Sequence, residues 1–161
     1  MSKHYEIERK FLIKMPNLLA LNDCEKVDII QTYLIDKVRI RACMTNGKEV
    51  YIKTKKQKIS DLVRIEDESE ITKQEYETLL NFADKQRQSI QKTRYKYPYD
   101  GKVFEIDIFP NWDDRALLEI ELGDENESFT IPPFIETIKE VTHLKEYRNF
   151  ALAKNFPKEI I

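Results

Sequence analysis

Charged residues recur at every second position in several stretches of this chain that otherwise have the composition of β-strands. In residues 5–13, Glu6, Glu8 and Lys10 are separated by Ile7 and Arg9. Side chains at positions i and i+2 of a strand share one face, so this spacing gathers charge on one side. Six further stretches show the same spacing: Arg39 and Arg41; Lys53 and Lys55; Arg64, Glu66, Glu68 and Glu70; Lys92 and Arg94; Glu105 and Asp107; Glu119 and Glu121.

A sheet face exposed to water is the ordinary explanation, and it accounts for any one of these strands taken alone. It accounts less well for the set, because solvated faces mix the two signs of charge. Here three strands carry only basic pairs and two carry only acidic pairs. Such sorting costs stability unless a multivalent ligand and its counter-ions offset it. We therefore predict that these faces line the interior of a closed barrel, whose apolar outer faces are covered by helices.

Turn and capping signals supply the elements of this barrel. The dipeptides Asn46-Gly47 and Asp100-Gly101 predict hairpins that join 37–44 to 48–55 and 92–99 to 102–109. Further strands are predicted at 5–13, 30–35, 61–71 and 117–122. Helices are predicted at 17–26, after the capping box at 72–75, after Pro132-Pro133, and at 143–155. The predicted class is α+β: one domain over residues 1–161, a closed eight-stranded antiparallel β-barrel or tunnel with a charged interior, flanked by several helices.

The hairpin registers test the interior hypothesis. A two-residue turn at Asp100-Gly101 pairs Arg94 with Asp107 on one face, as the hypothesis requires. A two-residue turn at Asn46-Gly47 would instead put Arg41 and Lys53 on opposite faces. We therefore predict a three- or five-residue loop, or a bulge, at the Asn46-Gly47 hairpin.

The overall composition limits the kinds of partner that this protein is expected to bind. The 161 residues carry 27 Lys and Arg against 29 Asp and Glu, a net charge of -2, so no overall field favours nucleic acid or a membrane. The two cysteines lack metal-site spacing, and no apolar signal core or membrane-spanning run occurs. We expect a cytoplasmic protein without nucleic-acid or membrane partners. A homodimer is compatible with the sequence.

The predicted interior has the chemistry of a polyphosphate site. Arg binds phosphate oxygens in bidentate fashion and Lys binds them as a point charge. Carboxylates beside them suit a hard divalent cation such as Mg²⁺, which binds a few carboxylates, waters and phosphates. Neither a Walker loop nor a GxGxxG motif occurs, so a glycine-rich loop is not the phosphate site.

These motifs resemble the CYTH, or triphosphate tunnel metalloenzyme, family. The segment Glu6-Ile7-Glu8-Arg9-Lys10 matches its ExExK signature. Over nearly the whole chain, further family motifs follow in order: Gln31-Thr32-Tyr33-Leu34, Arg39 with Arg41, residues 51–55, residues 64–68, Lys92-Thr93-Arg94, residues 105–107, residues 119–121, and residues 140–142 with Tyr147 and Asn149. Leu62-Val63 stands where the family often has glycine, a departure that should not affect the chemistry.

The resemblance implies a tunnel that binds triphosphate with Mg²⁺ or Mn²⁺. By position, it implies metal ligands at Glu6, Glu8, Glu119 and Glu121. It implies phosphate ligands at Lys10, Arg39, Arg41, Lys53, Lys55, Arg64, Lys92 and Arg94. A second set of carboxylates could orient water, hold a second metal or form structural ion pairs. Its members are Glu66, Glu68 and Asp107, which are the catalytic candidates, and Glu105.

The expected activity is metal-dependent hydrolysis of tripolyphosphate or a nucleoside triphosphate, as in the small bacterial inorganic triphosphatases. The family also contains thiamine triphosphatases, RNA triphosphatases and class IV adenylyl cyclases, which leaves these activities open. A non-catalytic polyphosphate sensor is a further alternative. It would lack a metal carboxylate, whereas all four are present here. The sequence also leaves open whether the C-terminal segment covers the barrel wall or closes one end.

Overall fold

The computed structural model describes the backbone of residues 2–161 and the side chains from residue 4 onward. The strands are β1 (Ser2–Lys14), β2 (Glu25–Tyr33), β3 (Arg39–Thr45), β4 (Lys48–Lys58), β5 (Val63–Ile71), β6 (Ile90–Tyr99), β7 (Lys102–Ile108), β8 (Arg115–Leu122) and β9 (Thr137–Glu140). The α-helices are α1 (Lys73–Leu79) and α2 (Asn149–Leu152), and the 3-10 helices are η1 (Leu18–Leu21), η2 (Leu80–Phe82) and η3 (Lys145–Tyr147).

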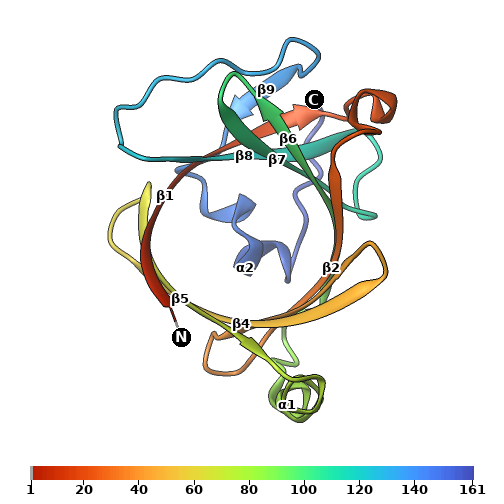
Figure 1. Cartoon of the computed structure of the whole chain (residues 1–161), viewed down its shortest axis with the longest axis vertical. Coiled ribbons are helices and arrows are strands. Elements are labelled where there is room, and N and C mark those ends of the chain that lie inside the picture. Colours follow the sequence, from red (N-terminus) through yellow and green to blue (C-terminus); the bar gives the residue numbers. More distant parts are fainter. Residues whose placement is uncertain (1) are drawn as a thin grey trace.

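Eight of these strands close into an antiparallel barrel, which confirms the predicted fold class. The order β5-β4-β3-β2-β6-β7-β8-β1 returns to its start because β1 also pairs with β5. The long strand β1 makes this possible: residues Ser2–Ile7 pair with β5, and residues Ile7–Lys14 pair with β8. Where β5 has ended, β9 pairs with Phe11–Ile13 of the same edge. Figure 1 shows the resulting ring of strands viewed along its interior.

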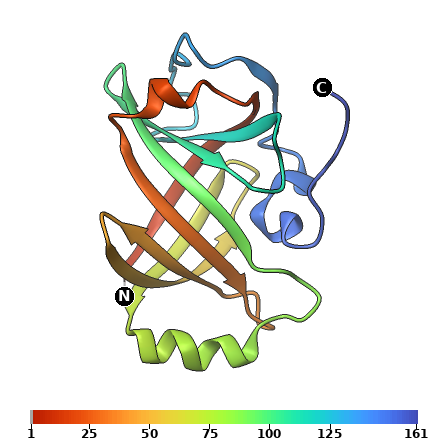
Figure 2. The same ribbon diagram turned by 90° about the vertical axis from the view of Figure 1, so that its right-hand side faces the viewer.

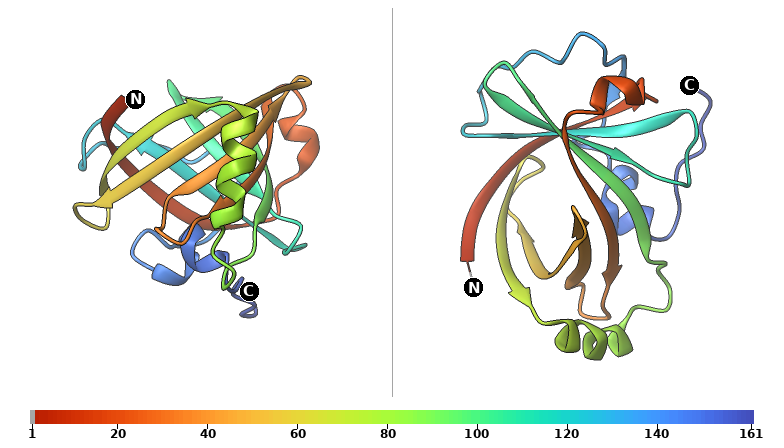
Figure 3. Two further views of the ribbon diagram at one scale, coloured as in Figure 1. Left: turned by 90° about the horizontal axis from the view of Figure 1, so that it is seen from below. Right: turned by 45° about the vertical axis from the view of Figure 1, so that its right-hand side comes forward.

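Most apolar side chains on the outside of the barrel are covered. On β1, β7 and β8 a large cluster includes Phe11, Phe104 and Ile120, and Phe129 and Phe134 of the segment after β8 pack against it. A smaller cluster forms where α1 contributes Tyr76 against Ile40 of β3. Figures 2 and 3 show α1 lying across one side of the barrel, outside the ring.

A third apolar cluster closes one end of the barrel. It joins Leu12 of β1 and Leu117 of β8, which face each other in register, to Tyr147 and Leu152 near the C-terminus. Trp112 packs there as well and donates its indole N–H to the carbonyl of Pro157 at 2.8 Å. In Figure 1, α2 lies within the outline of the ring. The C-terminal segment therefore closes a tunnel end.

The predicted loop or bulge at Asn46-Gly47 is wrong. Thr45 pairs with Lys48, so the turn has two residues, and Asn46 and Gly47 have φ of 50° and 78°. This left-handed pair is the mirror-image turn that matches the twist of an antiparallel hairpin, and Asn-Gly is its preferred sequence. The local turn chemistry therefore prevailed over the assumption that Arg41 and Lys53 share a face.

Several helix predictions are also wrong. Only the four residues of η1 are helical within 17–26, and β2 begins at Glu25. The segment after Pro132-Pro133 has no helix, and residues 143–155 contain only η3 and α2. Short amphipathic segments gain their order from packing, and here packing against the barrel favours irregular backbone. The capping-box helix is confirmed as α1, with Thr72 as its N-cap. Within residues 2–161, no helix is both long enough and apolar enough to cross a membrane.

Candidate functional site

A cavity of about 440 Å³ occupies the barrel interior between the open end and the C-terminal cluster. Ten of the residues predicted for the site line it: Glu6, Glu8, Arg39, Arg41, Glu66, Glu68, Arg94, Glu105, Glu119 and Glu121. Glu8 pairs with Glu121 in register across β1 and β8, so these two carboxylates share the inner face. The interior hypothesis is thereby confirmed for these positions.

Three more predicted residues are buried deeper in the barrel wall. Lys10 lies 3.2 Å from Glu119 and also donates to the backbone carbonyl of Tyr147 at 3.3 Å, which links the charged interior to the closed end. Lys92 lies 2.9 Å from Asp107, and both side chains are nearly fully buried. These cations stand where the cavity meets the apolar cluster.

The interior placement of Lys53 and Lys55 is wrong. Because Arg41 pairs with Ile52, the inward positions of β4 are those of Thr54 and Lys56, and the two predicted lysines face outward. Lys56 reaches Glu6 at 2.9 Å and Glu66 at 3.3 Å. The strict two-residue turn was the sequence signal that could have identified Lys56.

Arg64 stands opposite Glu6 in the β1–β5 register. Its guanidinium donates to the backbone carbonyl of Ser60 at 3.0 Å, and Arg64 is not among the residues that line the cavity. Besides Lys56, the polar lining residues that were not predicted as ligands include Glu25, Lys96, His4 near the open end, and Asn149 of α2. Asn149 belongs to the C-terminal family motif, but only the folded chain brings α2 to the cavity.

The basic side of the cavity has unused hydrogen-bonding capacity. Among residues 4–161, the Nε atoms of Arg39 and Arg41 and the Oδ1 atom of Asn149 are buried without a hydrogen-bond partner. Burial and the nearby Arg39 lower the pKa of Arg41 to about 10. Buried donors without partners are costly, and an anion with several oxygens would satisfy both guanidinium groups.

Carboxylates crowd the opposite side. Ligand atoms of His4, Glu6 and Glu121 lie within 4.8 Å of one another. Burial inside the barrel, followed by the charge of Glu119, raises the pKa of Glu8 to about 8. Like charges held this close repel, and a divalent cation coordinated by oxygen atoms would relieve the repulsion. The donor set therefore fits Mg²⁺ or Mn²⁺.

Asp107 is held by two cations. Arg94 donates to its two carboxylate oxygens at 2.8 and 2.9 Å, and Lys92 lies 2.9 Å from one of them. Burial opposes ionisation of Asp107, but Arg94 and Lys92 outweigh it and hold its pKa below the ordinary value. This carboxylate is well placed to orient the cations and poorly suited to accept a proton.

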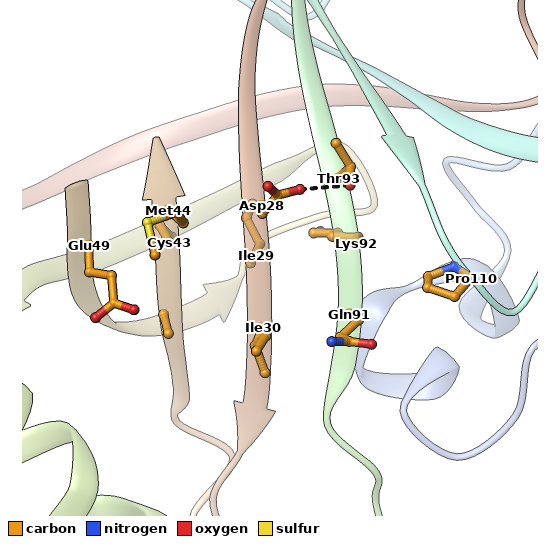
Figure 4. Close-up of a pocket in the computed structure, with 11 residues that line it drawn as sticks. Asp28, Ile29, Ile30, Cys43, Met44, Glu49, Gln91, Lys92, Thr93 and Pro110 are labelled. Carbon is orange, nitrogen blue, oxygen red and sulfur yellow. Dashed lines mark hydrogen bonds between the residues drawn. The ribbon is translucent and has the colours of Figure 1, made fainter. Parts of the chain in front are cut away.

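A second hollow, of about 340 Å³, lies on the outer wall over β2, β3 and β6. Figure 4 shows its residues, with Asp28 of β2 accepting a hydrogen bond from Thr93 of β6. It lacks the gathered charges of the interior.

Known proteins resemble this chain over almost its full length. An inorganic triphosphatase of Nitrosomonas europaea is 34% identical over 94% of this chain and 99% of that protein. One of Acetivibrio thermocellus is 34% identical over 93% and 94%. The solved structure of the inorganic triphosphatase NE1496 is 30% identical, covers 95% of this chain and 97% of its own, and has a TM-score of 0.58.

A putative adenylate cyclase of Bacillus halodurans, 16% identical with a TM-score of 0.54 over 78% of this chain and 84% of its own, shares the fold alone. No family model matches the chain. The ordered motifs, the closed barrel with its charged interior, and the full-length relatives agree. This chain belongs to the CYTH, or triphosphate tunnel metalloenzyme, family and is similar to its bacterial inorganic triphosphatases.

Proposed function

We propose that this protein hydrolyses a triphosphate inside the barrel, with inorganic tripolyphosphate as a substrate and Mg²⁺ or Mn²⁺ as the metal. One observation carries the proposal: Arg39 and Arg41, each with a buried Nε atom that has no hydrogen-bond partner among the described residues, face the crowded carboxylates of Glu8 and Glu121 across one cavity. Opposed walls of this kind suit a metal–polyphosphate complex. Relatives named inorganic triphosphatase support the choice of substrate.

The chain's own residues would bind and neutralise the substrate. Arg39, Arg41, Lys56 and Arg94 would donate to phosphoryl oxygens, and this charge stabilisation is the main means by which proteins accelerate phosphoryl transfer. Held by Glu6, Glu8, Glu121 and Glu119, the divalent cation would neutralise further phosphate charge. Lys10 would share Glu119 with the metal, since it lies 3.2 Å from that carboxylate.

Glu66 and Glu68 are the stronger candidates for orienting the attacking water. Both line the cavity, and each lies beside a cation that also faces the substrate site: Lys56 is 3.3 Å from Glu66, and Arg41 is 3.0 Å from Glu68. Asp107 is enclosed by Lys92 and Arg94, so we assign it the positioning of those cations.

The test is an assay of purified protein with tripolyphosphate or ATP in Mg²⁺, Mn²⁺ or excess EDTA, measuring orthophosphate, pyrophosphate and cyclic AMP. Metal-dependent release of both products, lost in Arg41→Met and kept in the outward-facing control Lys53→Met, is the expected result. Cyclic AMP and pyrophosphate from ATP would assign the protein to the cyclases instead. Tight binding of tripolyphosphate without turnover would make it a sensor. The prediction of a cytoplasmic location is checked separately by cell fractionation.

A further inference from the structure

A histidine lies among the carboxylates at the open end of the cavity. His4 and Glu6 are two residues apart on the inner face of β1, and Glu121 comes from β8, which pairs with β1. In the described part of the chain, these three form the one group of histidine, cysteine and acidic side chains whose ligand atoms all lie within 4.8 Å of one another. Glu8 and Glu119 are outside this group.

The spacing of the three side chains suits a single cation. An octahedral ion with bonds of ~2.1 Å has ligand atoms about 3.0 Å apart when they are adjacent and about 4.2 Å apart when they are opposite. Ligand atoms within 4.8 Å of one another therefore need to move by only about 1 Å each to enclose such an ion. His4 and Glu121 are both exposed, so their side chains are free to make that movement.

Contacts within the protein do not explain the position of His4. Its side chain is 46% exposed, and its Nε2 atom is 3.7 Å from Glu66, too far for a hydrogen bond. An exposed histidine at the end of a strand needs no partner, but this one faces a cavity beside Glu6, Glu66 and Glu121. Metal-bound histidines commonly have a carboxylate beside the ring to accept their other N–H, and Glu66 stands near that position.

The group lies at the opposite end of the cavity from the arginines. Along the inner face of β1, His4 is six residues before Lys10, which donates to the backbone carbonyl of Tyr147 at the closed end. Arg39 pairs with Tyr33, whose ring packs against Phe150 of α2 at that same closed end. An ion from solution therefore reaches the group at His4 without passing the phosphate ligands.

A nitrogen ligand changes which ion the group prefers. Mg²⁺ binds oxygen atoms and is usually held by one or two carboxylates together with the phosphates of a substrate. Imidazole favours first-row transition ions, and the affinity of a given nitrogen and oxygen site rises from Mn²⁺ to Co²⁺. A transition ion bound through His4 therefore needs no phosphate to hold it.

We propose that His4 is a metal ligand, and that together with Glu6 and Glu121 it binds a first-row transition ion such as Mn²⁺ or Co²⁺ in preference to Mg²⁺, before any substrate enters. This inference rests on the proposed function, which already places a divalent cation at Glu6 and Glu121. It adds the nitrogen ligand and the choice of ion.

The first measurement is pulsed electron paramagnetic resonance of substrate-free protein with one equivalent of Mn²⁺. A ring nitrogen bound to Mn²⁺ gives a nitrogen coupling in the spectrum, whereas carboxylates and water alone give none. The chain contains two histidines, so labelling histidine with ¹⁵N should change the coupling in the unmodified protein. This comparison depends on no variant.

The two histidines also supply matched variants. His4→Gln removes the nitrogen ligand but keeps an oxygen donor, and the exposure of His4 means that the fold should not depend on it. His143→Gln is the control, because His143 lies 3.0 Å from Asp61 and does not line the cavity. The coupling should disappear in His4→Gln and persist in His143→Gln.

Metal affinities give a second readout. Calorimetric titration of the substrate-free protein with each metal should show binding that weakens from Co²⁺ through Mn²⁺ to Mg²⁺. His4→Gln should weaken Co²⁺ binding about tenfold or more, Mn²⁺ binding by a smaller factor, and Mg²⁺ binding less than about twofold. A purely structural effect of the substitution would weaken all three alike.

Substrate-free protein that binds no Mn²⁺, or binds it without a nitrogen coupling, would overturn the inference. So would a coupling lost in His143→Gln instead of His4→Gln, or equal losses of affinity for the three metals. Hydrolysis of tripolyphosphate with Mn²⁺, assayed in parallel, tests the proposed function separately. Hydrolysis without the coupling would remove the role of His4 alone, whereas the coupling without hydrolysis would remove the proposed function and leave His4 as a ligand.

Discussion

Arg41 and Ile52 face one another across the β3–β4 hairpin. Because side chains alternate along a strand, this single pairing decides which side chains of β4 point into the barrel and which point outward. Lys56 consequently points into the cavity, where it bridges Glu6 and Glu66. Lys55, its neighbour, is exposed on the outside. Two adjacent lysines of identical chemistry therefore have different surroundings, which permits a controlled test.

Replacing Lys56 with methionine should reduce kcat/KM for tripolyphosphate by about 100-fold or more, because a preorganised cation facing the phosphoryl oxygens is lost. Lys55→Met should change it less than about twofold. Steady-state kinetics on both variants, with circular dichroism to confirm folding, makes the comparison. Equal losses would contradict the register of β4.

Metal-free protein should lose stability as pH rises. Folding raises the pKa of Glu8 from 4.5 to about 8, so between these values the folded protein binds more protons than the unfolded chain. The contribution of Glu8 to the free energy of unfolding is then present at low pH and falls as pH rises from 4.5 to about 8. Urea unfolding in EDTA at several pH values measures it. Glu8→Gln should flatten the dependence, and Mn²⁺ should counter the loss at pH 8 in the unmodified protein alone.

Asp107→Asn should destabilise the fold by about 3–5 kcal/mol, since it leaves two buried cations, Lys92 and Arg94, without their shared counter-charge. Glu105→Gln is the matched control. Glu105 lies 3.3 Å from Arg94 but is 31% exposed, so its loss should cost roughly 1 kcal/mol or less. Denaturant midpoints of the two variants, measured at neutral pH, should differ accordingly. Similar midpoints would show that the buried triad does not stabilise the barrel.

The closed end should depend on a contact between the β4–β5 loop and the C-terminal segment. Asp61 accepts hydrogen bonds from His143 at 3.0 Å and from Arg148 at 3.3 Å, just before α2. Asp61→Asn should increase amide hydrogen exchange in residues 143–152 while leaving β6 and β7 protected. Asp113→Asn, on a separate exposed loop, is the control. Unchanged exchange in 143–152 would show that the apolar packing of Tyr147 and Leu152 is sufficient to hold the segment.

Local patterns in the sequence were enough to predict the class of fold and the charged character of the barrel interior. Alternation of charge in strands such as that of Glu6 and Glu8 reports a face directly, because the side-chain period of a strand is two. The Asn46-Gly47 sequence, read as a two-residue turn, also predicts the observed pairing of β3 with β4. The error at Lys53 and Lys55 came from setting that local signal aside in favour of an assumed face.

Contacts between residues far apart in the chain were decided by tertiary structure alone. His4 lies close to Glu121 because β1 pairs with β8, which is far from it in the chain. Ile29, Cys43 and Val50 form one row because β2, β3 and β4 are paired in register. The C-terminal segment closes the tunnel because Leu12 and Leu117 leave apolar surface there for Tyr147 to cover. Short-range periodicity assigns a side chain to a face, whereas strand register and closure decide which faces meet.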